Sequence, residues 1–366
     1  MFRFLFYKKF FLVSLAFFIL YLAASFNILT FFFKVVQIIF VIVIIIPVLL
    51  IIAFYTLAER KIMGAVQRRK GPNVVGFWGL LQPLADGLKL ILKEPIIPRK
   101  SNKILFFLSP IITFVLAISL WSIVPFSASS FLTDSFLSLL IVFAISSLGI
   151  FGIIGAGWAS NSKYALLGSL RSAAQMISYE ISLGFIFLTI ILLTESANLF
   201  DIYLNQENCI NFFSLFPLGL IFFVSMLAET NRAPFDLPEA EAEIVAGYNI
   251  EYSGVLFALF FLGEYSNMFI MSCLFVILFF GGSPLISFFS LTWFILKIVI
   301  ICSLFILVRA VLPRVRYDQL MYVGWEIFLP ISLVFFFFLA SILFIDDLFF
   351  FWTEVNYLFY FVFFFS

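Results

Sequence analysis

Apolar stretches about 20 residues long recur along this chain and constrain its fold more than any other feature. A helix of that length crosses the hydrocarbon core of a bilayer, and the stretches are too continuous for the alternating pattern of a transmembrane β-barrel. Phenylalanine alone supplies 56 of the 366 residues, and 64% of the chain is hydrophobic, which is more apolar surface than a soluble core can bury. The sequence therefore predicts an all-α, polytopic membrane protein.

Eight apolar stretches form the predicted transmembrane core. They are residues 35–58, 104–125, 136–157, 173–194, 212–229, 253–280, 286–311 and 325–345. An apolar N-terminal extension (1–34), which either spans the bilayer or lies along it, precedes this core (35–345), and an apolar C-terminal extension (346–366) follows it. The predicted architecture is thus an eight-helix membrane domain with an apolar extension at each end.

One further helix is predicted between the first two core spans, from Gly79 to Pro95. Leu84, Leu88 and Leu92 recur there at helical spacing among charged residues, which is typical of an amphipathic helix at the membrane interface. It is either a plain surface helix or the wall of an entrance through which a lipid-soluble molecule leaves the bilayer. In the second case, Asp86 would face the opening.

The cations alternate between successive loops and set the orientation. Lys and Arg number ten in residues 59–103, two in 158–172 and three in 309–318, and the alternate loops hold neither residue. By the positive-inside rule, the cationic loops face the cytoplasm or the mitochondrial matrix. The loop after the fifth core helix lies on the same side by topology, although it is acidic.

Carboxylates are concentrated in residues 227–264, which we call the acidic segment. It holds seven of the 20 acidic residues of the chain and a single cation, Arg232. The seven are Glu229, Asp236, Glu239, Glu241, Glu243, Glu251 and Glu264. Ionisable groups at membrane depth are costly and usually mark ion paths or proton relays, and carboxylates so close together titrate as a coupled group. The alternative is a solvated acidic face.

Other ionisable residues lie beside or within the apolar stretches. Glu59 and Arg60 directly follow the first core span and are predicted to face a polar cavity rather than lipid. Glu180, near Tyr179 and Gln175 in the fourth core helix, is either a proton relay or a structural hydrogen-bond partner.

Two cations in the C-terminal half also need partners. Lys297 stands in the middle of the seventh core helix and is expected to pair with an acid on a neighbouring helix. Arg309, at the end of the same helix, is either an ordinary topology determinant or a counter-charge for the acidic segment.

The chain contains no histidine, and its three cysteines, Cys209, Cys273 and Cys302, are far apart in sequence. A haem on histidine, a four-thiolate iron–sulfur cluster and an ordinary zinc site are therefore not expected. We expect no catalytic redox centre, no metal and no bound cofactor in this chain, so that redox chemistry must come from a partner or a diffusing substrate. The formal net charge of +1 does not point to a nucleic-acid partner.

Two motifs are similar to those of a known family. They are Glu59-Arg60-Lys61 with Arg69-Lys70-Gly71-Pro72-Asn73, and Glu229-Thr230-Asn231-Arg232-Ala233-Pro234-Phe235-Asp236-Leu237. Together with the eight-helix core they resemble the membrane subunit 1 family of proton-pumping NADH:ubiquinone oxidoreductase, respiratory complex I. The resemblance covers residues 35–345, and the two flanking extensions have no clear counterpart in it.

The resemblance implies that the chain forms the membrane end of a ubiquinone tunnel and the start of a proton path. The implied tunnel residues are Glu59, Arg60, Asp86, Arg232, Phe235 and Asp236. The implied proton-path residues are Glu180, Glu229, Glu239, Glu241, Glu243, Glu251, Glu264 and Lys297, with Arg309 and Arg314 as charged support. Ubiquinone would be the substrate. The implied partners are peripheral quinone-site and iron–sulfur subunits, antiporter-like membrane subunits and membrane lipids.

The excess of phenylalanine is typical of T-rich organelle genomes and favours the mitochondrial inner membrane, with a bacterial inner membrane as the alternative. Two other functions are compatible with the residues. The first is the related membrane subunit of an energy-converting hydrogenase, which needs no quinone tunnel. The second is a stand-alone cation/proton transporter, in which repeated halves are more typical.

Overall fold

The computed structural model describes residues 45–125, 135–207, 210–236, 247–281 and 288–345, and within these ranges it contains helices and no β-strand. Six of the described helices are long and apolar enough to cross a membrane: Lys103–Ser122, Ser138–Ser160, Lys163–Thr194, Val255–Phe279, Leu291–Val311 and Tyr317–Ile345. The predicted all-α, polytopic membrane fold is thus confirmed. The count of eight core helices stays a prediction, and the extensions 1–34 and 346–366 lie outside the described residues.

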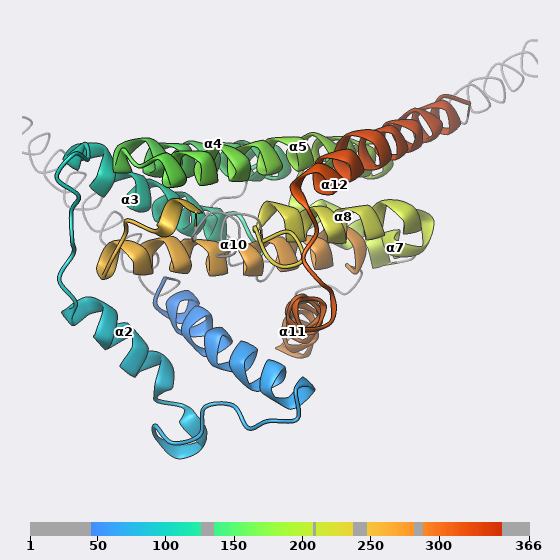
Figure 1. The fold of residues 1–366 in the computed structure, drawn as a ribbon. Coiled ribbons are helices and arrows are strands. Elements are labelled where there is room, and N and C mark those ends of the chain that lie inside the picture. The colour runs from blue at the N-terminus through green and yellow to red at the C-terminus, as the bar shows by residue number, and fades with distance from the viewer. Residues whose placement is uncertain (1–44, 126–134, 208–209, 237–246, 282–287, 346–366) are drawn as a thin grey trace, which may run out of the picture. The chain divides into compact units, whose positions relative to one another are not determined.

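The helices follow one another as labelled in Figure 1. Residues 45–66 form the first described helix. The later elements are η1 (Phe77–Gly79), α2 (Gln82–Leu92), α3 (Lys103–Ser119), η2 (Leu120–Ser122), α4 (Ser138–Ser160), α5 (Lys163–Thr194), α6 (Leu199–Leu204), η3 (Asn205–Glu207), α7 (Asn211–Ser214), α8 (Phe216–Glu229), η4 (Gly247–Asn249), α10 (Val255–Phe279), α11 (Phe288–Val311), α12 (Tyr317–Tyr322) and the π-helical turn η5 (Val323–Phe328). An α-helix continues from η5 to residue 345.

Helix α10 forms the core of the bundle. Internal contacts divide the chain into two units, Met1–Ile51 and Ile52–Ser366, and the packing described here lies within the second. In α10, 72% of the apolar stretch is buried, against 6% in Tyr317–Ile345. Figure 1 shows α4 and α5 side by side, and α10 packs against α3, α8 and α11. The outer helices therefore supply most of the apolar surface that lipid or partner subunits cover.

Small residues let α4 approach both of its neighbours closely. A Cβ atom on Gly152 would overlap the methyl group of Thr113 in α3, and a Cβ atom on Gly157 would overlap the hydroxyl of Ser169 in α5. Larger side chains at these positions would separate the helices, so the glycines serve helix packing.

Several helix ends differ from the sequence prediction. The first helix continues to residue 66, beyond the predicted end at 58, so Glu59 lies on the helix and not after it. Helix α5 begins at Lys163, ten residues before the predicted start, so Glu180 lies near its middle. The last span begins at Tyr317 and not at residue 325. In each case hydropathy marked only the apolar part of a helix whose more polar turns contain good helix formers.

The fifth predicted span, 212–229, is interrupted. Helix α7 ends at Ser214 and α8 begins at Phe216, because Pro217 has no N–H to continue the preceding helix and a fixed φ that suits the first turn of the next. The 14 residues of α8 extend over about 21 Å, less than the apolar thickness of a bilayer, about 30 Å. The chain continues from α8 as a non-helical segment, residues 230–236.

The predicted amphipathic helix is present as α2, which ends at Leu92, three residues before Pro95. None of its residues is buried, and Leu84, Leu88 and Ile91 are exposed. An exposed row of leucine and isoleucine beside Lys89 is the surface expected of a helix that lies at the membrane interface.

Candidate functional site

A buried carboxylate, Glu59, forms the centre of a charged cluster. Its side chain accepts a hydrogen bond from Nη1 of Arg309 and a second one, of 2.6 Å, from the hydroxyl of Tyr265. Nη1 of Arg232 lies 3.8 Å from the same carboxylate oxygen that Arg309 binds. These residues, which we call the Glu59 cluster, come from the first described helix, the segment after α8, α10 and α11. Glu59 is 4% exposed, so its two cationic neighbours offset much of the cost of burying its charge.

Arg232 is held against an aromatic ring as well as near an acid. Its guanidinium lies 4.3 Å from the centre of the Tyr265 ring, and the residue is only 6% exposed. The preceding residue, Asn231, has a φ of 50°, a left-handed conformation that asparagine tolerates better than most residues. The backbone N–H of Arg232 then donates to the carbonyl of Leu227, which closes the turn after α8. The turn thus directs the Arg232 side chain into the Glu59 cluster.

Helix α5 and the loop between α11 and α12 fix the non-helical segment 230–236. The side-chain amide of Gln175 in α5 donates to the carbonyls of Ala228 and Phe235, at 2.7 and 3.0 Å. The N–H of Val315 donates to the carbonyl of Pro234. Arg314 lies 3.6 Å from the buried carboxylate of Asp236. The predicted residues Phe235, Asp236 and Arg314 are therefore brought together at this segment.

Arg60 points away from the Glu59 cluster and toward α2. It forms an ion pair of 2.7 Å with Asp86, whose other carboxylate oxygen accepts a hydrogen bond of 3.0 Å from Gln82. The side chains of Arg60 and Asp86 are 49% and 38% exposed. Adjacent residues of one helix therefore connect an exposed pair at the amphipathic helix with a buried cluster inside the bundle.

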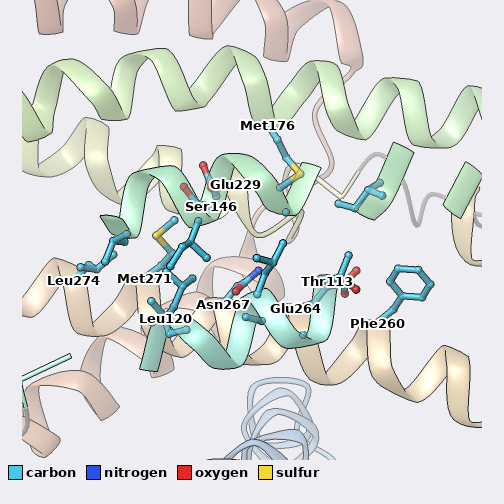
Figure 2. A pocket seen from close by; sticks show the side chains of 18 of the residues that line it. Thr113, Leu120, Ser146, Met176, Glu229, Phe260, Glu264, Asn267, Met271 and Leu274 are labelled. Atoms are coloured by element: carbon cyan, nitrogen blue, oxygen red, sulfur yellow. The ribbon is translucent and has the colours of Figure 1, made fainter. Parts of the chain in front are cut away.

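A second group of acids lines a cavity of about 60 Å³, which we call the acidic cavity. Figure 2 shows the side chains around it, among them Glu229 from α8 and Glu264 and Asn267 from α10. Glu264 accepts a hydrogen bond of 2.6 Å from the hydroxyl of Tyr248. Within the described residues, Oε2 of Glu229 and Oδ1 of Asn267 have no hydrogen-bond partner. A cavity of this size with several polar groups has room for a few water molecules.

The other predicted acids lie at different places. Glu180 is half-buried in α5 and close enough to Glu229 for the two carboxylates to interact. Glu251 lies in the turn before α10. The acids Glu239, Glu241 and Glu243 fall outside the described residues.

The expected polar neighbours of Glu180 are engaged elsewhere. Tyr179 donates to the carbonyl of Leu320, at 3.0 Å, and Gln175 donates to the segment after α8. Tyr179 is one residue from Glu180 and Gln175 is five, and neither spacing places two side chains on the same face of a helix. Proximity in sequence therefore did not predict the contacts of Glu180.

Lys297 binds backbone carbonyls and not the carboxylate expected from the sequence. Its ammonium donates to the carbonyls of Phe280 and Gly281, at 2.5 and 3.3 Å, just after the end of α10. Gln206 and Asn211 donate to two further carbonyls of this helix end. A helix C-terminus carries partial negative charge and unpaired carbonyls, so it can stabilise a cation inside an apolar region.

Sequence reasoning missed three polar residues of these sites: Tyr248, Tyr265 and Asn267. Tyr265 binds Glu59 and stacks on Arg232, whereas Tyr248 and Asn267 line the acidic cavity. The available signal was their position next to acids in an apolar helix or loop. Tyrosine is enriched at membrane–water interfaces, so that signal is weak for the two tyrosines.

Metal ligands are not grouped in the described part of the chain. No set of three or more histidine, cysteine, aspartate or glutamate side chains there is arranged to hold a metal ion. Cys273 and Cys302 are buried and free, and the sulfur of Cys302 lies 3.1 Å from the hydroxyl of Ser272.

Comparison with known proteins places the chain in a family. The family model described as NADH dehydrogenase matches residues 39–340. NADH-ubiquinone oxidoreductase chain 1 of Chondrus crispus is 54% identical over 80% of this chain and 92% of its own length. The protein of the same name from Triticum aestivum is 57% identical over 77% and 89%. A subunit of the NADH-quinone oxidoreductase of Paramagnetospirillum magneticum is 54% identical over 80% and 87%.

These matches cover the helices that carry both groups of charged residues. The relatives are named as subunits of NADH:quinone oxidoreductases, so the matches favour this family over a hydrogenase subunit or a stand-alone transporter. The chain belongs to the NADH dehydrogenase subunit 1 family, and it is a multi-pass membrane subunit of NADH:quinone oxidoreductase, respiratory complex I.

Proposed function

We propose that this chain forms the membrane end of the ubiquinone tunnel and the first part of the proton path that couples quinone reduction to proton translocation. The relatives are named for the reaction of NADH with ubiquinone or quinone, which supports a quinone as the substrate of the assembly. The Phe-rich composition supports the mitochondrial inner membrane as the location.

The amphipathic helix supports the tunnel entrance. The exposed leucines of α2 suit the apolar tail of a quinone, and the Arg60–Asp86 pair lies beside them. Arg60 and Glu59 are neighbours, so polar groups continue from this exposed pair to the buried Glu59 cluster. Arginine and tyrosine are hydrogen-bond donors, and the carbonyl oxygens of a quinone head are acceptors. A quinone that enters at α2 would therefore meet donors along its way.

The acidic cavity supports the proton path. Glu229 and Glu264 line it together, and Glu180 interacts with Glu229. Carboxylates can take up and release protons, and water between them would allow transfer. Glu239, Glu241 and Glu243 would extend this path, with Glu251 beside it. Lys297, bound at the far end of α10, would act as a fixed charge on the same axis.

One observation carries the coupling between the two sites: both are built on the same two segments. Glu229 in the acidic cavity and Arg232 in the Glu59 cluster are three residues apart. Glu264 and Tyr265 are adjacent in α10, and the first lines the cavity while the second binds Glu59. A change of charge at the Glu59 cluster therefore acts directly on the segments that hold the two cavity carboxylates.

The electrons would come from outside this chain, from an iron–sulfur centre of a peripheral subunit. The proton path would couple quinone reduction to the antiporter-like membrane subunits. The membrane surface of the chain would also contact lipids.

The test is the replacement of single path carboxylates in the assembled complex. We expect Glu180→Gln and Glu241→Gln to lower quinone reduction and proton pumping together, by at least about tenfold, while assembly persists. Glu195→Gln is the matched control, because Glu195 is exposed just after the C-terminal end of α5. Normal turnover and pumping in an assembled Glu180→Gln/Glu241→Gln double variant would show that these acids carry no protons.

A further inference from the structure

We propose that Tyr248 is a positioning residue, which holds the carboxylate of Glu264 in the acidic cavity. The proposal rests on the proposed proton path. It adds an uncharged residue to that path and assigns to the hydroxyl of Tyr248 the role of holding the Glu264 carboxylate.

The geometry around Tyr248 is that of a fixed donor. Its hydroxyl lies 2.6 Å from Oε1 of Glu264, and the residue is only 1% exposed. Its ring packs edge-on against Phe260, one turn before Glu264 in α10, with ring centres 5.4 Å apart. Both Tyr248 and Glu264 line the acidic cavity. The aromatic ring is held by packing, so its hydroxyl has a defined position relative to the carboxylate.

The backbone of Tyr248 is anchored on the other side. A Cβ atom on Gly168 of α5 would lie 2.6 Å from the Cα of Gly247, so the backbone of η4 rests directly against this helix. Tyr248 thus bridges α5 and α10, the two helices that carry Glu180 and Glu264. A displacement of η4 would therefore move the hydroxyl relative to Glu264.

The chemistry suits both states of the acid. A tyrosine hydroxyl donates to a carboxylate and can also accept from a protonated carboxyl group. A hydrogen bond to the charged form stabilises that form, so the position of Tyr248 affects how readily Glu264 accepts a proton. In the described part of the cavity lining, the other carboxylate that faces this pair is Glu229, from α8.

The chain provides a matched control in Tyr252. This residue is buried four positions later, and its ring also packs edge-on against Phe260, at 5.0 Å. Its hydroxyl, however, bonds with the hydroxyl of Ser109, at 3.0 Å, and not with an acid. Burial raises the pKa of Tyr252 to about 12. Tyr248→Phe and Tyr252→Phe therefore remove the same atom from similar surroundings, and only the first loses a bond to a carboxylate.

The experiment measures ubiquinone reduction and proton pumping by the assembled complex. We expect Tyr248→Phe to lower kcat by about tenfold with KM for ubiquinone unchanged, the effect of losing one hydrogen bond to a charged group. Tyr252→Phe should leave both parameters within about twofold of the original protein. In a Glu264→Gln background, Tyr248→Phe should add no further loss, since the two residues act through one bond. If Glu264→Gln has no measurable turnover, Glu264→Asp replaces it as the background.

The outcomes separate this proposal from the proposed function. If Glu264→Gln lowers pumping while Tyr248→Phe behaves like Tyr252→Phe, the positioning role is wrong and the proton path stands. If Tyr248→Phe and Tyr252→Phe lowered kcat equally, and their losses added in the double variant, packing alone would explain both effects. That result would also overturn the positioning role. If Glu264→Gln pumps normally, the proposed path itself fails.

Discussion

The Glu59 cluster allows a quantitative test of how much a buried ion pair stabilises this membrane protein. Glu59→Gln preserves the size of the side chain and removes its charge, which leaves Arg232 and Arg309 without a carboxylate at this position. Removal of one partner from a buried pair costs about 3–5 kcal/mol. Arg309 is 33% exposed, so water screens part of the effect. We therefore expect a loss of about 3 kcal/mol, the lower end of that range.

The adjacent residue supplies the control. Arg60→Gln breaks the pair with Asp86, whose two side chains are 49% and 38% exposed. Exposed pairs contribute about 0.2–1 kcal/mol, because water already solvates both charges. Two neighbouring substitutions that each remove one charge should therefore differ in cost by about 2 kcal/mol or more.

Buried thiols provide the assay. Cys302 lies in α11 with Arg309, and Tyr55, one turn before Glu59, donates to the carbonyl of Cys302. Alkylation of Cys302 in the purified complex, followed by mass spectrometry, reports how often this region opens. When closing is faster than alkylation, the rate follows the open population. A loss of about 3 kcal/mol then raises the alkylation rate by about 100-fold, against at most about fivefold for Arg60→Gln.

Equal alkylation rates in the Glu59→Gln and Arg60→Gln variants would refute the buried-pair argument. A further check is Glu59→Gln combined with Arg309→Gln, which removes both charges of the closest pair. Removing both partners of a buried pair costs less than removing one, so this double variant should open less often than Glu59→Gln alone.

Two further predictions concern the proposed quinone entrance and the N-terminal extension. Asp86→Phe should raise KM for short-tailed ubiquinone more than for long-tailed ubiquinone, because a bulky group at α2 would weaken entry of a quinone head that has little tail to anchor it. Glu94→Phe, beyond the end of α2, is the control. If Asp86→Phe changed KM equally for both quinones, the result would contradict the proposed entrance. Removal of residues 1–30 should leave KM for ubiquinone unchanged, and a loss of quinone binding would place this extension in the tunnel.

Hydropathy and charge were sufficient to predict the class of fold and the residues with unusual energetic demands. Glu59, Arg232 and Asp236 stood out because ionisable groups beside apolar stretches are costly, and all three are buried in the structure. The amphipathic pattern of α2 was also readable, since leucines at helical spacing next to lysines are typical of a helix at the membrane interface.

The partners of these residues could not be predicted. Glu59 meets Arg309 across 250 positions of sequence, and no local pattern connects them. Lys297 shows that the energetic cost of burying a cation does not identify its partner. A buried cation needs negative charge nearby, and both a carboxylate and the carbonyl groups at the end of α10 can supply it. The helix extents were wrong for a related reason. Hydropathy indicates which residues suit contact with lipid. A helix such as α5 continues beyond those residues, as long as its backbone N–H and C=O groups form helical hydrogen bonds.

The shortness of α8 has a consequence for where charge can lie. The helix ends after 14 residues, and the irregular backbone that follows it is buried, so its carbonyls need hydrogen-bond partners within the protein. The side-chain amide of Gln175 and the N–H of Val315 meet that need by donating to the carbonyls of Phe235 and Pro234. A turn, which no helical register constrains, is then free to present Arg232 and Asp236 to opposite partners, the carboxylate of Glu59 and the guanidinium of Arg314.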